Sequence, residues 1–566
     1  MNKPLRNMTA LALLLAVGTL VSAHRAAAAA PKPALTIAFA GYGQFIDSLK
    51  TLDQLSGHTK LAAKAEANIE LQTRGKGLAG LDKSRPWGVL ISLGENDQPV
   101  VQGFLPVTDL KQLLSSIPML GGDAPVGNAS GVYEFPMGDR TAYVKQKGKW
   151  ALFSDNEETL NSAPADPTPA LADLTKTYLL SVRGSIQNVP PARRENFLNS
   201  LQGVVEFTLA MQQQSASPEE RAMQSASIKQ MFARLQKLAK ELDTVVIGLG
   251  MDPSSKSLFL DFEARGIEGT ELTRKLDAMK DAKTDFAGFA LPGAAMTMLT
   301  AGTSDDEDVA DAKAVLANYK ASANKLLDAN EQLGDKRDLA KQLLGDLMQV
   351  VEKTIELKKS DAGMAVVLDG GPAAVAGIRI ADGAKLESTL KKLVKEIKAD
   401  EPQVGEFVKL DAEKYEGVNF HVAKIPIPDP KAAEVFGDTV KIVIGISPST
   451  LYLGAGKDPI ATLKTAIDAS KASPGKAINP VELVISGTPI AKFFAKVIPA
   501  DEDAQAKKNF AKAASSLAES GGKEHVTMTV KAIPHGASMR LNVESGVTKT
   551  ILDLLPVGGR DDAGEN

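Results

Sequence analysis

The second half of this 566-residue chain repeats the order of elements that we predict for the first half. A strand within Ala34–Tyr42 corresponds to one within Phe286–Gly302, and a hairpin pattern at Trp87–Val107 corresponds to Gly363–Ala381. The later pairs keep the same order: 131–135 with 417–421, 141–160 with 439–463, 178–184 with 481–487, and 257–266 with 538–546. Identity between the halves is weak, and the spacings need insertions. Such recurrence indicates a duplicated structural unit, and we expect the two copies to meet near residue 284.

Hairpin-like pairs of strands dominate both halves, and strict strand–helix–strand alternation is absent. This pattern predicts mostly antiparallel sheets. Long helices with one apolar stripe are expected from Pro191 to about Asp243, with a break at Ser215–Pro218, and from Ser304 to about Leu333. Another helix should follow Gly334–Asp335. The predicted fold class is therefore α+β, with two pseudo-repeat halves, each a mostly antiparallel sheet partly covered by long amphipathic helices.

Several helix starts are marked by capping residues. Asp382, and Thr108 or Asp109, are expected to be N-caps of short helices that follow the hairpin patterns. Ser304 with Glu307 has the spacing of a capping box. These signals predict where the helices begin.

The N-terminus has the pattern of an export signal. Lys3 and Arg6 precede an apolar stretch at Met8–Val21, and small residues allow cleavage after Ala23 or within Ala26–Ala30. The apolar stretch is shorter than the roughly 20 residues of a usual membrane span. We therefore expect a periplasmic or secreted protein whose mature chain has no transmembrane segment. The expected organisation is a signal peptide at 1–23, a first repeat at 24–284, a second at 285–557 and a disordered tail at 558–566.

Composition excludes several chemistries. The chain has no cysteine, so disulfides, thiol catalysis and cysteine-ligated metals are ruled out. Lys and Arg total 65 against 69 for Asp and Glu, which gives no basic excess for binding nucleic acid.

The few histidines do not form a metal-binding motif. There are five: His24, His58, His421, His525 and His535. None lies four residues from another, and HExxH is absent. His525 and His535 lie at the two ends of the final hairpin, where they could face each other. We expect no metal and no cofactor.

No nucleophile or phosphate-binding motif stands out either. GxSxG is absent, and Ser447 falls in a turn between two strands. Gly41 and Gly43 separate a strand from a helix, but the remainder of a nucleotide-binding fingerprint is missing. No catalytic or cofactor-binding residue is therefore predicted.

Charged and aromatic groups have structural explanations. The acidic runs Asp305–Asp308 and Asp501–Asp503 fit helix N-termini. The first lacks the ligand spacing of a calcium loop, and the second does not require a role as paired glycosidase carboxylates. Trp87 and Trp150 are expected to pack in a core. A lysine-rich face is expected to be solvated; it comprises Lys385, Lys391, Lys392, Lys395 and Lys398, interleaved with Glu387 and Glu396.

Three segments resemble those of a group of exported proteins of unknown function typical of planctomycete bacteria. They are SRPWGVLI (84–91), GFLPVTDLKQLL (103–114) and GVYEF…TAYVKQKGKWALFSD (131–155). The resemblance covers the first half; in the second, Ile380-Ala381-Asp382 stands where the first has Pro106–Asp109, and Thr450 stands for Trp150. It implies export and a non-enzymatic role, and carries no site residues.

The leading functional hypothesis is a non-catalytic exported protein that binds an envelope partner or an apolar ligand, the latter in a pocket between sheet and helix. One alternative is a structural or assembly component of the envelope, which would display a large apolar patch. The other is a hydrolase whose site is assembled in space from His421 or His525, a carboxylate and a serine.

Overall fold

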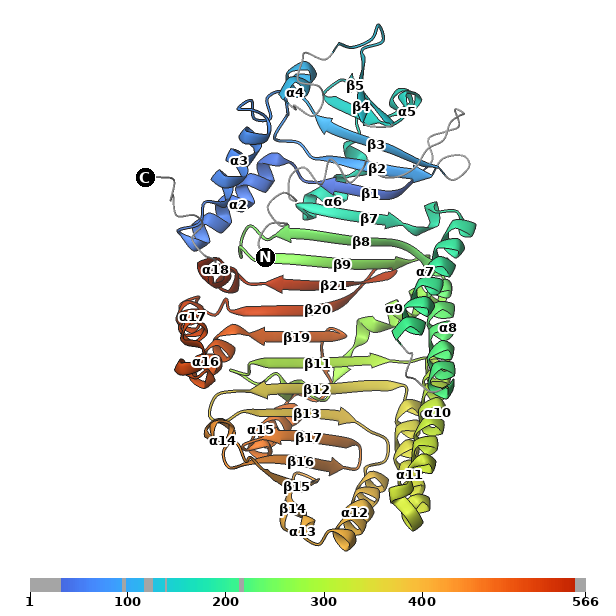
Figure 1. The fold of residues 1–566 in the computed structure, drawn as a ribbon, viewed down its shortest axis with the longest axis vertical. Coiled ribbons are helices and arrows are strands. Elements are labelled where there is room, and N and C mark those ends of the chain that lie inside the picture. The colour runs from blue at the N-terminus through green and yellow to red at the C-terminus, as the bar shows by residue number, and fades with distance from the viewer. Residues whose placement is uncertain (1–31, 94–97, 117–125, 138–139, 213–217, 555–566) are drawn as a thin grey trace. The chain divides into compact units, whose positions relative to one another are not determined.

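The computed structural model describes residues 32–93, 98–116, 126–137, 140–212 and 218–554. The predicted signal peptide, His24 and the predicted tail lie outside these residues. The chain forms two compact units, which divide between Thr273 and Arg274. Figure 1 shows the helices and strands of both. We call the N-terminal one unit one and the other unit two.

Unit one contains a nine-stranded sheet. Its strands are β1 (Pro33–Phe39), β2 (Trp87–Leu93), β3 (Pro99–Pro106), β4 (Val132–Met137), β5 (Arg140–Lys147), β6 (Trp150–Ser154), β7 (Leu180–Ser185), β8 (Leu242–Met251) and β9 (Leu258–Gly266). They are paired in the order β4-β5-β6-β3-β2-β1-β7-β8-β9, and every pairing is antiparallel. The predicted antiparallel α+β architecture is confirmed for this unit.

Two helical pairs lie at opposite ends of these strands. The first pair, α2 (Tyr42–Ser56) and α3 (Leu61–Gln72), joins β1 to β2, and the second, α7 (Pro191–Gln212) and α8 (Pro218–Glu241), joins β7 to β8. Because β2 and β7 both run antiparallel to β1, the two connections fall at opposite strand ends. The shorter helices are α4 (Leu110–Ser116), α5 (Glu157–Ser162), α6 (Ala172–Thr177) and α9 (Glu271–Ala278).

Unit two contains a ten-stranded antiparallel sheet. Its strands are β11 (Met296–Thr303), β12 (Lys359–Val367), β13 (Ala373–Arg379), β14 (Val408–Tyr415), β15 (Val418–Pro426), β16 (Thr439–Ser447), β17 (Thr450–Gly456), β19 (Val481–Ser486), β20 (His525–Ile533) and β21 (Gly536–Val543). The order is β14-β15-β16-β17-β13-β12-β11-β19-β20-β21. Strands β10 (Lys283–Thr284) and β18 (Lys476–Ala477) form a separate short ribbon.

The helices of unit two follow a similar plan. The pair α10 (Asp306–Ala329) and α11 (Arg337–Glu356) joins β11 to β12, and α16 (Gly487–Val497) with α17 (Ala500–Ala518) joins β19 to β20. The remaining helices are α12 (Gly383–Asp400), α13 (Val404–Phe407), α14 (Pro430–Phe436), α15 (Pro459–Lys471) and α18 (Ser545–Leu554). No helix in the described part of the chain is long and apolar enough to cross a membrane.

Most of the predicted helix starts are confirmed. Asp382 accepts a hydrogen bond from the Lys385 N–H at 2.9 Å, and Asp109 accepts one from the Gln112 N–H at 3.0 Å. The capping box predicted for Ser304 and Glu307 is wrong by one residue.

The observed capping box is formed by Asp305 and Asp308. Asp305 accepts from the Asp308 N–H at 2.8 Å, and the Asp308 carboxylate accepts from the Asp305 N–H at 3.2 Å. Asp305 takes the N-cap role expected of serine, since aspartate caps as well as serine does. Asp308 takes the role expected of glutamate, because its carboxylate reaches back to the N–H of the N-cap residue.

One face of each sheet carries a packed core. In unit two, α15 and the turn at Ala287–Phe289 cover strand residues such as Phe420 and Val443, which have 0% exposure. Gly363 and Gly377 lie under the rings of Phe286 and Phe289, where a Cβ atom would come within 3 Å of them. Side chains therefore fill the space between this face and α15. We call it the covered face.

The corresponding core of unit one involves α5 and α6. Leu160, Leu171 and Leu174 pack against strand residues that include Phe104 and Trp150. Trp150 is 3% exposed, as predicted for a core tryptophan, and its ring meets that of Phe104 edge-on at 6.0 Å. Trp87 is only half-buried and lies 4.7 Å from the ring of Phe39.

Replacing Phe289 by alanine tests the core of unit two. The side chain is fully buried, so Phe289→Ala should lower the free energy of unfolding by about 3–5 kcal/mol, the cost of lost burial and a cavity. Urea denaturation measures this change. Leu326→Ala, at a residue 72% exposed on α10, should change it by less than about 0.5 kcal/mol. Equal effects of both substitutions would contradict the assignment of this core.

Candidate functional site

A polar cluster surrounds His421 on β15, beneath α12. His421 is 4% exposed, and its Nδ1 accepts a hydrogen bond from the Asp411 N–H at 3.0 Å. An imidazole that accepts at Nδ1 carries its proton on Nε2 when neutral. Nε2 lies 3.8 Å from Glu387 Oε1 and has no hydrogen-bond partner among the described residues. His421 is thus a neutral ring with one buried, unused donor.

Two carboxylates flank this ring and share one ammonium group. Glu387 comes from α12, and Asp411 comes from an irregularity in the β14–β15 pairing, where its φ is 50°. Lys391 Nζ lies 2.7 Å from Glu387 Oε1 and 2.8 Å from Asp411 Oδ1. The Asn419 amide donates to both carboxylates. The cluster ties α12 to β14 and β15.

The pKa shifts follow from this arrangement. Burial lowers the pKa of His421, although Glu387 and Asp411 oppose the shift. Burial alone would raise the pKa of Glu387, but the hydrogen bonds from Lys391 and Asn419 outweigh it and lower the pKa. The pKa of Asp411 is lowered by Lys391 first and Asn419 second. Hydrogen bonds to Asp411 and Glu387 raise the pKa of Lys391.

Three potential metal ligands meet here, because one ligand atom each of Glu387, Asp411 and His421 lies within 4.8 Å of the others. The protonation pattern opposes a metal ion. Lys391 already bridges the two carboxylates, and Nε2 could ligate only if both ring nitrogens were without a proton. The groups do not fit a metal site.

The first unit supplies a further argument for a structural role. The sequence correspondence pairs the strand at 417–421 with the one at 131–135, so that Phe135 is the counterpart of His421. Phe135 is 4% exposed and packs in a cluster with α4 residues Leu110, Leu113 and Leu114. In the repeat expected from the sequence, His421 therefore corresponds to a core aromatic residue of the first unit.

The other histidines considered in the sequence analysis lie outside this cluster. His58 Nδ1 lies 2.7 Å from Ser56 Oγ, and His525 Nδ1 lies 3.0 Å from Glu544 Oε2. His535 occupies the β20–β21 turn with a φ of 57°. His525 and His535 are at the ends of the hairpin as predicted, but they do not face each other, because His525 begins β20 and His535 follows its last residue.

Ser447 and the glycines of GYGQF also have structural roles. The Ser447 hydroxyl donates to the Thr450 carbonyl at 3.4 Å within the β16–β17 turn. Gly41 has a φ of 128°, and a Cβ atom there would lie 2.7 Å from the Arg85 carbonyl oxygen. The Gly43 N–H donates to the Lys83 carbonyl at 2.8 Å, so this helix start is occupied by the chain itself.

The lysine-rich face of α12 is less solvated than expected. Besides Lys391, Lys385 pairs with Asp346 at 2.6 Å, and Lys398 donates to the Val408 carbonyl at 3.0 Å. Lys392 and Lys395 are exposed, as the sequence predicted. The difference arises because α12 contacts α11 and β14 on two sides, which sequence periodicity does not reveal.

The most informative surface is the face of each sheet opposite the covered face, which we call the open face. In unit one, a row of opposed residues crosses all nine strands on this face: Phe262, Ile247, Val182, Ile37, Val89, Gly103, Phe153, Val144 and Tyr133. The residues that alternate with them, such as Ala38, Phe104 and Val246, belong to the core of the covered face. Apolar side chains therefore occur on both faces of this antiparallel sheet.

Part of the open face of unit one has no cover. At one end of the row, Tyr133 and Val144 are 8% exposed and pack with α4. At the other end, four large side chains on β8 and β9 are 42–44% exposed: Ile247, Leu249, Leu260 and Phe262. An antiparallel sheet with one solvated face normally carries polar residues there, so this surface is suited to an apolar ligand or partner.

Unit two has an equivalent row: Leu541, Met528, Leu483, Met298, Met364, Ala376, Leu453, Ile444 and His421. The row ends beneath α12 in the polar cluster. Away from α12, large side chains are 37–38% exposed: Ile378, Leu453, Met539 and Leu541. Unit two thus also has a largely apolar open face.

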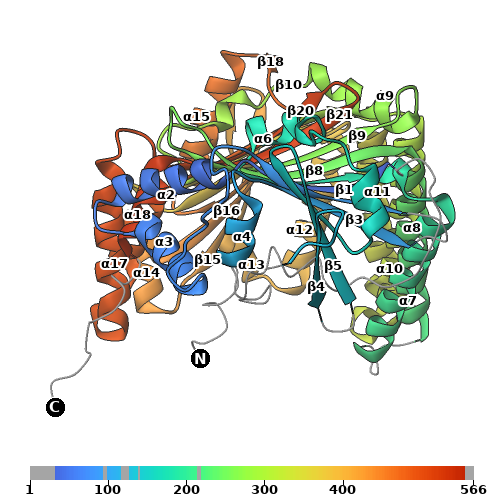
Figure 2. The ribbon, with the colours of Figure 1, turned by 90° about the horizontal axis from the view of Figure 1, so that it is seen from above.

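Helices border each open face. In Figure 2, α6 lies on one side of the sheet of unit one, and α3, α4 and the α7–α8 pair extend to the other side. Within unit two, α15 lies on one side, and α10, α12 and α17 extend to the other. Each open face is therefore bordered by helices at both ends of its strands.

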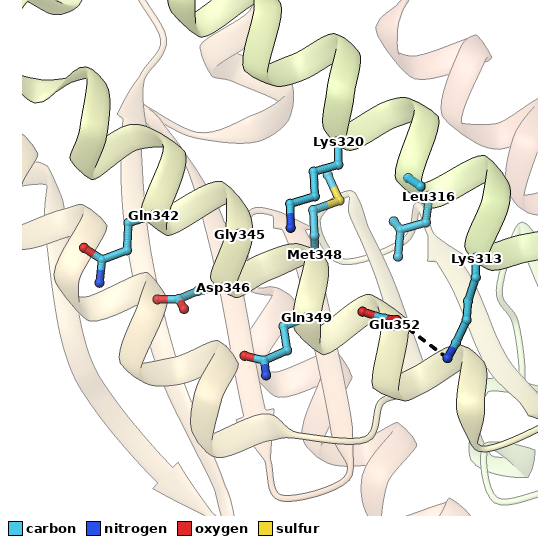
Figure 3. A pocket seen from close by; sticks show the side chains of 10 residues that line it. Lys313, Leu316, Lys320, Gln342, Gly345, Asp346, Met348, Gln349 and Glu352 are labelled. Atoms are coloured by element: carbon cyan, nitrogen blue, oxygen red, sulfur yellow. Dashed lines mark ion pairs between the residues drawn. The ribbon is translucent and has the colours of Figure 1, made fainter.

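A groove of about 530 Å³ lies between α10 and α11 (Figure 3). Its lining is mixed, with Leu316 and Met348 beside charged and amide side chains. Lys313 pairs with Glu352 at 3.6 Å and with Glu356 at 2.5 Å, and Asp346 pairs with Lys385. Because Lys313, Asp346 and Glu352 of its lining are engaged in these ion pairs, the groove has the character of a seam between two packed helices.

No protein-family model matches this chain, and neither a curated protein nor a solved structure is found to be similar to it. The argument for function therefore depends on the residues described above.

Replacing His421 by asparagine tests the protonation state of the cluster. The pKa of His421 is lowered from its ordinary value of 6.5, so the folded protein binds fewer protons than the unfolded chain. Stability due to neutral His421 is present above pH 6.5 and is lost as the pH falls toward the folded-state pKa. His421→Asn can keep an acceptor for the Asp411 N–H but cannot titrate. Below pH 6.5, this substitution should therefore reduce the slope of the free energy of unfolding against pH by up to about 1.4 kcal/mol per pH unit.

Urea denaturation between pH 5 and 7 measures this slope. His58→Asn is the matched control, because His58 lies in an exposed turn. A slope that His421→Asn leaves unchanged would show that folding does not lower the pKa of His421.

Proposed function

We propose that this protein is a non-catalytic binder of lipid-like molecules, whose long apolar chains lie on the open faces of the two sheets. The observation that carries the proposal is the pair of rows, which are apolar except for His421 at the end of the second, each with large side chains left 37–44% exposed. Water contact with such side chains is unfavourable, and burying them under a ligand contributes roughly 25 cal/mol per Å².

The chemistry of the open face favours acyl chains over polar ligands. From β19 to β21 its side chains are Val, Leu, Ile, Met and Ala, including Leu483, Ile485, Met528 and Met539. Methionines adapt to irregular apolar shapes because their side chains are flexible and polarizable. Side chains of this kind offer no hydrogen bonds to a sugar, nucleotide or peptide, so specificity would come from hydrophobic contact.

The proposed binding surface is not where the sequence analysis expected it, which was in a pocket between sheet and helix. Packed cores fill the covered faces, and the binding surface that we propose is the opposite side of each sheet. The adjacent helical pairs would limit the length of chain that lies along the strands.

The strand order supports duplication as part of the proposal. β4-β5-β6-β3-β2-β1-β7-β8-β9 in unit one corresponds, in turn, to β15-β16-β17-β13-β12-β11-β19-β20-β21 in unit two, and β14 is an addition. Helical pairs interrupt the same two connections. We infer two related binding surfaces, one per unit. The signal-like N-terminus supports export, which would place them in the cell envelope.

Binding of cis-parinaric acid, a fatty acid whose fluorescence rises in apolar surroundings, tests the proposal. Wild-type protein should bind the probe. Leu249→Glu with Phe262→Glu should abolish binding to unit one, because a carboxylate buried against an acyl chain costs several kcal/mol. Ile378→Glu with Leu541→Glu should do the same in unit two. Each double variant should lower the number of bound probes without changing the remaining affinity.

The control is Leu71→Glu, at a residue on α3 that is 75% exposed and belongs to neither row. Absence of a fluorescence rise with wild-type protein, or equal binding by all variants, would refute the proposal. Native mass spectrometry of the protein from an exporting host, beside its denatured mass, would identify a retained lipid. A native mass of two chains that the open-face variants dissociate would assign the face to assembly instead.

A further inference from the structure

Helix α7 of unit one carries an exposed apolar stripe of its own. Its members are Phe197, Leu201, Val204, Phe207 and Met211, which are 39–68% exposed. At 100° per residue, these five positions fall within about a third of the helix circumference. We call them the α7 stripe.

The other side of α7 has a partner within the unit. Leu198, Gln202 and Val205 are half-buried, and α7 contacts α8. Arg194 donates to Gln187 Oε1 at 2.9 Å and to the Ala239 carbonyl at 2.6 Å, which holds the start of α7 against the end of α8. The α7 stripe is therefore a fixed surface on a braced helix.

The size of the α7 stripe argues against a stable dimer as its occupant. A buried aromatic side chain contributes roughly 150–250 Å², so five partly exposed side chains offer on the order of 500 Å². Stable interfaces bury about 800 Å² per partner. A bilayer has no such requirement, because each inserted side chain gains independently from contact with acyl chains.

Charge points to the same occupant. Helices α7 and α8 carry seven Lys and Arg residues against five Glu, in a chain whose net charge is −4. Lys229, Arg234, Lys237 and Lys240 on α8 are exposed, and of these Lys237 also pairs with Glu271 of α9 at 2.9 Å. A cationic excess on the helical pair that carries the α7 stripe is complementary to a membrane surface that contains anionic lipid.

We propose that α7 docks onto the surface of a lipid bilayer containing anionic lipid, with the α7 stripe inserted among the outer ends of the acyl chains. The helix is 22 residues long and spans about 33 Å, so all five side chains can enter one leaflet at the same depth. This docking uses residues different from the open faces and does not depend on ligand binding there.

Co-sedimentation with vesicles tests the proposal. Vesicles of phosphatidylcholine, with and without phosphatidylglycerol, are mixed with the full mature chain at low salt. Wild-type protein should sediment with the anionic vesicles and less with the neutral ones. Phe197→Asp with Phe207→Asp should weaken binding by about tenfold or more, since each substitution replaces a large apolar group with a charge.

The matched control is Tyr319→Asp with Leu326→Asp, two residues on α10 that are 67% and 72% exposed. These substitutions should leave vesicle binding within about twofold of wild type. Circular dichroism and thermal unfolding establish that each variant is folded. As a milder probe, Phe207→Trp should show a blue-shifted emission on anionic vesicles and quenching by brominated lipid.

Three results would overturn the proposal. The first is no sedimentation of wild-type protein with anionic vesicles. The second is equal binding by the α7 and α10 variants, or no change in the emission of Phe207→Trp. The third is a wild-type dimer by light scattering that the α7 variant dissociates, which would assign the α7 stripe to a second copy. The vesicle test is independent of the cis-parinaric acid test, so failure of that probe to bind the open faces would not affect the proposal for α7.

Discussion

Antiparallel pairing of the strands is the interaction on which the remainder of each unit depends. It satisfies the backbone hydrogen bonds of nine or ten strands in one surface and sends alternate side chains to opposite faces. One face of each sheet is then buried by short helices and turns, above all α15 in unit two and α5 with α6 in unit one. Long helical pairs are inserted only at the strand ends, and this leaves much of the second face uncovered.

The apolar character of that second face connects the fold to the proposed function. A structure that needed only stability would place polar residues at Leu249, Phe262, Leu453 and Leu541. Their exposure costs free energy unless a ligand covers them, which is why we interpret the open faces as binding surfaces. The cluster at His421 is different in kind. Its charges are paired with one another, so it fastens α12 over the end of the row.

Much of the architecture could be predicted from the sequence, because it depends on local pattern. Hairpin spacing gave the antiparallel strands, and Asp382 and Asp109 marked helix starts. The capping box was misplaced by one residue, since several acidic residues in a row can all cap. The open faces were missed, although a signal was present. Segments such as TVVIGLGM (244–251) and LFLDF (258–262) are apolar at both alternating positions, a pattern that cannot show which face lacks a cover.

The sequence by itself determined the class of fold, the absence of cysteine chemistry and the positions of most strands and long helices, because these follow from composition, periodicity and capping over short distances. Only the tertiary structure decided which side chains meet. It brought Glu387, Lys391, Asp411 and His421 together from α12, β14 and β15. It also aligned single residues from nine strands into each apolar row. Those contacts join residues tens or hundreds of positions apart, and strand order, which sets them, is a property of the whole sheet.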